Sequence, residues 1–456
     1  MKKINSVILY LNAVLILLTY NSVCSQVKQE WAAIYNGTGN SYDGGFSVAV
    51  DRPGNVYVTG TSTKRESGED ITTIKYNSSG VQLWIAFYNG PVSLNDRGVS
   101  VAADDSGNVY VTGTSTGSGA LEDIVTIKYS SSGDSVWVRR FNGEGDSVDI
   151  ANAVTVDGSG NVCVSGSSIG KGTTYDYTAI KYSPSGEQLW AARYNGPGNG
   201  IDWVFSMTAD SSGNVYLTGG SLGKRTFYDY ATIKYSPSGK MLWTARYDAE
   251  KYNDEATAIA VDGSGNVYVT GSSNSDFGFF QKMIGMDFAT VKYSPDGRLK
   301  WVKRYNSREN KQDVSKALAV DDSDNVYVAG LSGLGFGGLP VVSDLVIIKY
   351  NKAGDEIWKT EYSVSENSHE TAEAMALDNS GNVIITGFSF YHYENYLTIM
   401  MNSSGRTVWS KIYNGSSGGS DISKSVAVDD SGNVYVTGES DNVGSGSDIV
   451  TIKYSK

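Results

Sequence analysis

The chain has 456 residues, of which 53 are glycine, 31 are tyrosine and only 7 are proline, and charged residues make up 19%. This composition is typical of many short β-strands joined by tight turns, not of a helical protein. The formal net charge of −12 disfavours nucleic acid and anionic lipid as partners, because both are polyanions that an acidic surface repels.

The first 25 residues differ in character from the rest. Lys2 and Lys3 precede an apolar run from Val7 to Leu18, and a small residue, Ser25, precedes Gln26. This pattern is typical of a signal peptide, and the run is too short for a transmembrane helix. We therefore expect residues 1–25 to be removed on export, and the protein to be secreted or held at the cell surface without inserting into the membrane. Cys24 offers a lipoprotein alternative, but the residues before it are a poor lipidation signal.

A glycine-rich string recurs eight times along the rest of the chain. Its first copy runs from Gly54 to Gly60, and an aspartate precedes every copy at a spacing of 51 to 59 residues. These aspartates are Asp51, Asp104, Asp157, Asp210, Asp262, Asp321, Asp378 and Asp429. Because so regular a period covers residues 26–456, it leaves no room for a second domain, and we expect one domain of eight repeats of about 53 residues.

Each repeat contains four runs with the pattern of β-strands. In the first repeat these runs are Phe46–Asp51, Asn55–Gly60, Ile71–Tyr76 and Val81–Tyr88. The fourth run always carries a tryptophan: Trp31, Trp84, Trp137, Trp190, Trp243, Trp301, Trp358 and Trp409. About fifty residues and four antiparallel strands are the signature of one blade of a β-propeller.

The two ends of the repeat region predict how the blades close into a ring. The mature chain would begin with a lone fourth run, Trp31–Tyr35, and end with a third run, Ile449–Tyr454, that lacks its fourth. We therefore predict an all-β, eight-bladed propeller in which the amino-terminal strand completes the last blade. We also expect the protein to be a monomer.

The repeat resembles a known family. The run Ala258–Asp262, continued by Gly271 and by Ala289–Tyr293, resembles the bacterial SBBP β-propeller repeat, and it recurs in every unit. This resemblance implies a secreted or surface-exposed propeller. A weaker resemblance links Ser185–Trp190 to the docking motif of quinoprotein-like eight-bladed propellers. Those quinone enzymes use adjacent cysteines and calcium; no such cysteine pair exists here, so the resemblance implies the cofactor-free members and we expect no cofactor.

Several shared features have simple structural interpretations. We expect the tryptophans to dock each blade on the next, and Cys163, which replaces a tyrosine of the sister repeats, to be a small buried apolar residue. The turn aspartates offer one or two carboxylates each, too few for calcium, so we expect them to cap hairpin turns. Ion pairs with these aspartates are the expected role of seven lysines: Lys75, Lys128, Lys181, Lys234, Lys292, Lys349 and Lys453.

Two further sets of acids are expected in loops on the opposite face of the propeller. The first precedes the first strands: Asp43, Asp96, Asp149, Asp202, Asp254, Asp313, Glu370 and Asp421. The second precedes the third strands: Asp70, Asp123, Asp176, Asp229, Asp287, Asp344 and Asp448. Such a double set of acids either caps turns or attracts cations and basic partners, and the sequence leaves both interpretations open.

The repeat is broken in blades five to seven, where the loops between the second and third strands are irregular and rich in aromatic residues. Exposed aromatic side chains on loops suit stacking against sugars or anchoring a protein partner. In blade seven, Met400 also replaces the repeated lysine and Asn395 replaces the repeated aspartate. Our candidate binding residues are Phe279, Phe280, Phe336, His369, Glu370, Tyr391, His392 and Tyr393.

We therefore predict a non-enzymatic, secreted or cell-surface scaffold that recognises a protein or a polysaccharide through these loops. Two alternatives are a polysaccharide-degrading hydrolase or lyase, and a purely structural scaffold of the cell envelope. The only histidines, His369 and His392, could form a metal site or an acid–base pair with Glu370. No catalytic or metal-binding motif accompanies them, so we predict no catalytic residue and no metal.

Overall fold

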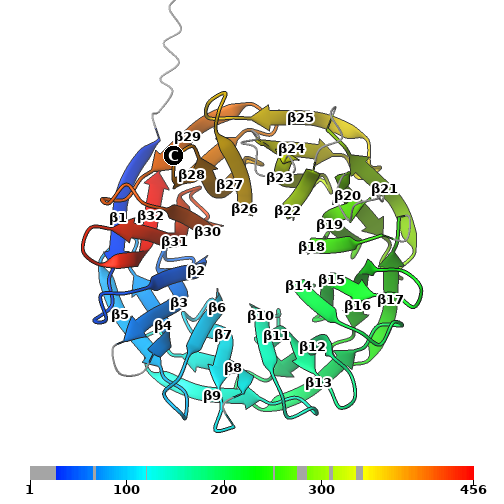
Figure 1. Ribbon diagram of the computed structural model, residues 1–456, viewed down its shortest axis with the longest axis horizontal. Coiled ribbons are helices and arrows are strands. Elements are labelled where there is room, and N and C mark those ends of the chain that lie inside the picture. The colour runs from blue at the N-terminus through cyan, green and yellow to red at the C-terminus, as the bar shows by residue number, and fades with distance from the viewer. Residues whose placement is uncertain are drawn as a thin grey trace, which may run out of the picture.

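The computed structural model describes residues 27–64, 68–119, 121–249, 252–274, 285–307, 312–334 and 343–455. Over these residues the protein is a closed ring of eight four-stranded antiparallel sheets, as predicted (Figure 1). All the regular secondary structure in this part of the chain is strand. Within each blade the first strand lies nearest the central axis and the fourth lies at the periphery.

The strands of the first four blades follow one another in chain order. Blade one contains β2 (Asp43–Val50), β3 (Val56–Lys64), β4 (Gly68–Tyr76) and β5 (Gln82–Tyr88). Blade two contains β6 (Asp96–Ala103), β7 (Val109–Thr116), β8 (Glu122–Tyr129) and β9 (Ser135–Phe141). Blade three contains β10 (Asp149–Val156), β11 (Val162–Ile169), β12 (Tyr175–Tyr182) and β13 (Gln188–Tyr194). Blade four contains β14 (Asp202–Ala209), β15 (Val215–Leu222), β16 (Tyr228–Tyr235) and β17 (Met241–Tyr247).

The remaining blades continue this order until the last one. Blade five contains β18 (Asp254–Val261), β19 (Val267–Asn274), β20 (Met286–Tyr293) and β21 (Leu299–Tyr305). Blade six contains β22 (Gln312–Val320), β23 (Val326–Leu334), β24 (Asp344–Tyr350) and β25 (Glu356–Tyr362). Blade seven contains β26 (His369–Leu377), β27 (Val383–Phe390), β28 (Glu394–Met401) and β29 (Thr407–Tyr413). Blade eight contains β30 (Asp421–Val428), β31 (Val434–Asn442), β32 (Gly446–Ser455) and β1 (Lys28–Tyr35).

Blade eight joins the two ends of the chain, which confirms the predicted closure. Strand β1 pairs antiparallel with β32, from Lys28 opposite Ser455 to Tyr35 opposite Ile449. In Figure 1 the blue β1 therefore lies directly beside the red β32. The ring is closed by hydrogen bonds between strands and not by a covalent turn.

The hydrophobic core lies between blades. At the closure, Val56, Val58 and Ile74 of blade one pack against Tyr435 and Ile449 of blade eight. Such interfaces recur around the ring, because a neighbouring blade covers each sheet on both faces.

The tryptophans dock neighbouring blades on one another, as predicted. Trp190 of blade three donates its indole N–H to the Pro237 carbonyl oxygen of blade four, 2.9 Å away. Its ring also lies against Gly239, which has a positive φ of 82°, and a Cβ on that glycine would stand 2.6 Å from the indole. Only glycine fits both the backbone conformation and this close approach.

The first strands begin earlier than predicted. In blade one the expected start was Phe46, but β2 begins at Asp43. The pairing of β2 with β3 shifts between Gly45 and Ser47, so Phe46 forms a β-bulge and pairing resumes beyond it. The bulge breaks the alternation of apolar and polar residues by which the strand was predicted. The three paired residues before it, 43–45, were therefore missed.

Candidate functional site

The two faces of the ring carry different connections. One face is formed by the hairpins that begin at the repeated aspartates, such as Asp51, and by the turns between third and fourth strands. We call it the turn face. We call the loop face the opposite one, formed by the connections between second and third strands and between blades. The strand order places both sets of connections on these two faces in every blade.

On the turn face, the repeated aspartates hold their own hairpins. The Asp51 carboxylate accepts the backbone N–H of Asn55 at 2.7 Å and the hydroxyl of Tyr57 at 2.8 Å. In the next blade, burial works against ionisation of Asp104, but hydrogen bonds from Asn108 and Tyr110 outweigh it and lower the pKa of this carboxyl. These bonds are those of a turn cap, as the sequence predicted.

The repeated lysines behave differently from the prediction in most blades. Lys181 and Asp157 form an ion pair of 2.7 Å, and Lys349 lies 3.6 Å from Asp321. Elsewhere the ammonium group takes another partner: Lys75, for example, donates to the Ser131 carbonyl oxygen of the next blade at 3.1 Å. The predicted ion pairing is therefore wrong for these blades. In blades one, two and four a tyrosine hydroxyl donates to the aspartate.

Cys163 explains why blade three differs. It occupies the place of that tyrosine, is fully buried, and burial raises the pKa of its thiol to about 12. With no tyrosine hydroxyl available, Asp157 pairs with Lys181 instead. Cys163 is thus a buried apolar residue, as expected, and an unreactive thiol.

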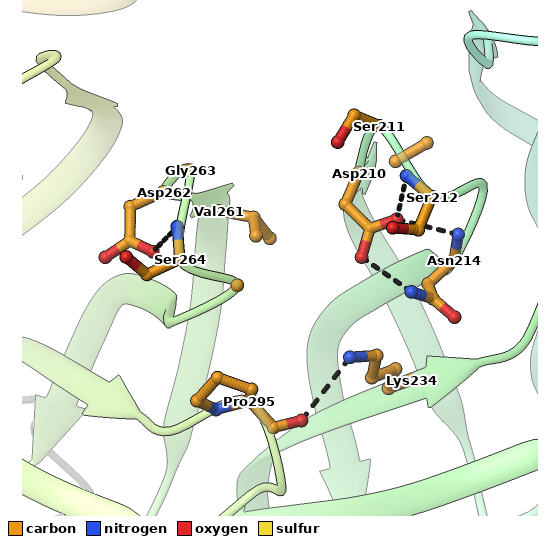
Figure 2. Close-up of a pocket in the computed structure, with 12 residues that line it drawn as sticks. Asp210, Ser211, Ser212, Asn214, Lys234, Val261, Asp262, Gly263, Ser264 and Pro295 are labelled. Atoms are coloured by element: carbon orange, nitrogen blue, oxygen red, sulfur yellow. Dashed lines mark hydrogen bonds between the residues drawn. The ribbon is translucent and has the colours of Figure 1, made fainter.

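Clefts on the turn face follow from the repeat. One of 430 Å³ lies between blades four and five, where the turns of Asp210 and Asp262 face each other above Lys234 (Figure 2). Lys234 donates to the Pro295 carbonyl oxygen at 3.3 Å, and Asp210 accepts from Ser212 and Asn214 of its own turn. A similar cleft of 450 Å³ separates blades six and seven. The polar groups of the cleft in Figure 2 already bind one another, so it does not point to a ligand.

On the loop face, the first set of acids lies within the first strands and not in the loops before them, so their predicted placement is wrong. All eight side chains are completely buried, at the start of the first strands. In seven blades the carboxylate accepts a backbone N–H from the connection before it; Asp43, for example, accepts from Gly37 at 2.6 Å. Burial raises the pKa of these seven aspartates, and that of Asp254 to about 6. They cap turns and are not available as a cation-attracting surface.

The second set of acids also lies within strands, and in four blades it is neutralised by arginine. Each arginine is the residue before the last one of a fourth strand. The ion pairs are Arg140–Asp123 at 2.7 Å, Arg246–Asp229 at 2.6 Å, Arg304–Asp287 at 2.7 Å, and Arg193–Asp176. The fifth pair, Lys64–Asp70 at 2.8 Å, uses a lysine from β3 in blade one. Sequence reasoning missed these pairs, although an arginine before the terminal tyrosine or phenylalanine of four fourth strands was the available signal.

Of the candidate binding residues, Phe279, Phe280 and Phe336 lie outside the described residues. Tyr391 and Tyr393 each expose 56% of their surface, in the connection between β27 and β28. The rings of Tyr391 and His392 meet edge to face at 4.3 Å. The structure thus brings Tyr391 and His392 into contact and presents both tyrosines on the loop face.

His369 and Glu370 have positions of their own. The Nδ1 atom of His369 lies 3.2 Å from the backbone N–H of Ser343 in blade six and accepts from it. Its ring packs against Phe390 at 5.9 Å. Glu370 is buried and accepts the Ser389 hydroxyl at 2.8 Å. These contacts join strands and blades, and none of them brings His369 or Glu370 to His392.

The described residues contain no group of three or more histidine, cysteine, aspartate or glutamate side chains that could hold a metal ion. Nor does the described part of the chain contain a helix long and apolar enough to cross a membrane.

The fold defines an eight-bladed β-propeller with no second domain among the described residues. Residues 92–119, 242–278 and 408–444 match the family model described as "Beta-propeller repeat", SBBP. These three segments therefore carry the SBBP repeat, which agrees with the resemblance seen in the sequence.

A relative of known sequence is an uncharacterized WD repeat-containing protein of Acanthamoeba polyphaga mimivirus. It is 24% identical over 372 residues, which are 70% of this chain. These residues span only 25% of the length of that relative.

Solved structures with a similar fold include enzymes. A polysaccharide lyase is 11% identical with a TM-score of 0.48, over 77% of this chain and 89% of that one. An ulvan lyase is 8% identical with a TM-score of 0.46, over 85% and 98%. A gluconolactonase from Xanthomonas campestris is 12% identical with a TM-score of 0.33, over 62% and 82%. Likeness at this level carries no inference about activity.

Proposed function

We propose that this propeller is a non-enzymatic binding scaffold, and that a protein partner contacts the loop face at blade seven. The observation that carries the proposal is the pair of exposed tyrosines, Tyr391 and Tyr393, on either side of His392. Tyrosine is enriched among the residues that dominate protein interfaces, because it offers a large rigid surface with a polar tip.

The other described loops of the same kind support the choice of blade seven. Among the described connections between second and third strands, the others expose at most one large apolar side chain each: Leu121, Phe227 and Val443. Blade seven presents two aromatic side chains two residues apart. A departure from the repeat in one blade is better evidence of function than a feature shared by all blades.

The environment of His369 and Glu370 supports a non-catalytic role. His369 uses Nδ1 to accept a backbone N–H, and Glu370 is buried against Ser389, so both serve contacts within the fold. A general acid or base must instead reach a bound substrate.

A triple variant tests the binding surface. Tyr391→Ala/His392→Ala/Tyr393→Ala should lose proteins that the wild type captures from its own organism. The matched control, Leu121→Ala/Phe227→Ala/Val443→Ala, removes three exposed side chains from corresponding loops of other blades and should capture them normally. Equal capture by all three proteins would overturn the proposal.

Two parallel assays address the other functions. Binding to a glycan array that depends on the same three residues, without protein capture, would assign the surface to a polysaccharide. Release of new reducing or unsaturated ends from a panel of polysaccharides would show an enzyme and overturn the non-enzymatic part of the proposal.

We further propose that the protein is exported and acts as a monomer at the cell surface or outside the cell. The basis is the signal-like sequence of residues 1–25, which lie outside the described residues. The mature protein should begin at Gln26 when its amino terminus is sequenced, and should elute as a monomer. An intact Met1 terminus in the cytoplasmic fraction would contradict export.

A further inference from the structure

The arginines of blades two, four and five bind the same set of acceptors. Arg246 donates to the Asp229 carboxylate at 2.6 Å, to the Ser221 hydroxyl and carbonyl oxygens at 2.6 and 2.7 Å, and to the hydroxyl of Tyr194 at 3.1 Å. Arg140 and Arg304 make the same four contacts in blades two and five. The guanidinium group thus ties three strands of one blade to the tyrosine that ends the blade before it.

Blade six keeps these acceptors but has lost the arginine. Asp344, Ser332 and Tyr305 occupy the positions of the aspartate, serine and tyrosine, and Ser332 is paired with Asp344 in the register of β23 and β24. The hydroxyl of Tyr305 lies 3.3 Å from that of Ser332, so the two groups still meet. At the position of the arginine stands Glu361, which reverses the charge.

The charges of blade six are not balanced as they are in its sisters. Lys359, which is 34% exposed, pairs with Glu361, which is 52% exposed, at 3.2 Å, and its ammonium group also lies 4.7 Å from the centre of the Tyr305 ring. By contrast, none of the ion pairs or hydrogen bonds that the structure describes involves the Asp344 carboxylate. Burial raises the pKa of Tyr305 to about 12, although its hydrogen bond with Ser332 acts in the opposite direction. The negative charges of Glu361, Asp313 and Asp344 raise it further.

A second uncompensated acid lies beside this position. Glu370 is completely buried, and its Oε2 atom has no hydrogen-bond partner among the described residues. Its backbone N–H donates to the carbonyl oxygen of Ser343, the residue before Asp344. In blade seven, too, the arginine position is filled by another residue, Ile412, which is exposed.

We propose that the acceptors left without their arginine in blade six form a receptor site for a guanidinium group of the partner protein, which would displace the more exposed Lys359 from the Tyr305 ring. The guanidinium would donate hydrogen bonds to Asp344, Ser332 and Tyr305. The arginines of blades two, four and five donate to the equivalent residues in the same way. Glu361 would add a second carboxylate at the rim. The planar guanidinium, with its several N–H donors, matches acceptors that surround one point better than the point charge of an ammonium group does. The site lies on the loop face, so the inference deepens the proposed function by naming the chemistry of the partner.

The probe is a capped Gly-Arg-Gly peptide, compared with its citrulline counterpart, which has the same shape without the charge. Titration calorimetry or NMR on the full chain should show the arginine peptide binding at least about tenfold tighter than the citrulline peptide. Equal binding of the two peptides would overturn the proposal.

Glu361→Arg restores the residue of the sister blades and supplies the sharpest variant. It should fill the site from within, abolish binding of the arginine peptide and raise the thermal midpoint. Glu356→Arg makes the same charge change at the other end of β25 and should leave binding within about twofold. If Glu361→Arg still bound the peptide like the wild type, the site would be elsewhere.

Asp344→Asn keeps the shape of the site and removes its main charge, and it too should lose the arginine peptide. The Tyr391→Ala/His392→Ala/Tyr393→Ala variant leaves this site intact and should retain the peptide fully. The two proposals therefore fail separately: loss of selectivity for arginine refutes the receptor site, and unchanged protein capture refutes the tyrosine surface.

Discussion

Trp31 donates its indole N–H to the carbonyl oxygen of Ser78, 3.1 Å away, and so ties the first strand of the chain to blade one. Six other tryptophans make the same bond to the next blade: Trp84, Trp137, Trp190, Trp243, Trp301 and Trp358. The Nε1 atom of Trp409 has no partner among the described residues. Trp409 faces blade eight, where the residue equivalent to Ser78 is Lys456, two beyond Tyr454, and lies outside the described residues.

Removing the closing strand should therefore destabilise the whole ring. A variant that lacks residues 27–35 loses the pairing of β1 with β32 and exposes the apolar edge of blade eight. Trp31→Ala alone should lower the free energy of unfolding by about 3–5 kcal/mol, the usual cost of truncating a large packed aromatic residue. Thermal unfolding checks both. An unchanged midpoint in the deletion variant would contradict closure by β1.

The buried acids make stability depend on pH in a defined direction. Burial raises the pKa of Asp254 from 3.8 to about 6, despite hydrogen bonds from Ser273 and Ala249 that favour the charged form. Between these two values the folded state binds more protons than the unfolded state, so the free energy of unfolding should fall as the pH rises from about 4 to about 6. The shift corresponds to an upper limit of about 3 kcal/mol for this residue.

Asp254→Asn should flatten that dependence, because an amide can still accept the backbone N–H of Ala249 but does not ionise. Midpoints measured from pH 4 to pH 7 provide the check, with the exposed Asp105→Asn as the control. A fall as steep in Asp254→Asn as in the wild type would show that this carboxylate is not the source of the effect.

The buried ion pair of blade three predicts an unequal response of two equivalent lysines. Lys181 and Asp157 are 1% and 2% exposed, and the hydroxyl that serves the aspartate elsewhere is absent because Cys163 replaces the tyrosine. Lys181→Met leaves a buried carboxylate without its cation, and should cost about 3–5 kcal/mol.

Lys75→Met is the matched control for that substitution. Methionine fits this position, since Met400 occupies it in blade seven, and Asp51 keeps its bond from Tyr57. The loss at Lys75 should therefore be clearly smaller. Equal losses of stability in the two variants, measured by chemical unfolding, would contradict the special role of the pair.

The fold could be predicted from the sequence because eight copies reinforce every local signal. The tryptophan and the aspartate recur in every repeat and have the same role in most blades, so one interpretation explains most of them. The order of the end strands then gave the closure by β1 without any knowledge of contacts.

The candidate site could be predicted only in part. The aromatic loop of blade seven was visible as a break in the repeat, and Tyr391 and Tyr393 are indeed exposed. The burial of Glu370 and its sister acids was not visible, because a bulge moved the start of each first strand. The missing arginine of blade six was also overlooked, since its importance depends on which side chains meet across three strands.

A last prediction separates blade docking from backbone strain. Gly239 and Gly172 have nearly the same positive φ, 82° and 81°, so an alanine at either position meets the same conformational penalty of about 1 kcal/mol. Their surroundings differ. A Cβ at position 239 would stand 2.6 Å from the indole of Trp190, whereas a Cβ at position 172 has nothing within 4 Å. Gly239→Ala must therefore also displace the tryptophan, which should lower the free energy of unfolding by about 1–3 kcal/mol more. Chemical unfolding of the two variants measures the difference. If both lost the same stability, the close approach of Trp190 to this turn would contribute nothing to docking, and the glycine would be required by its backbone alone.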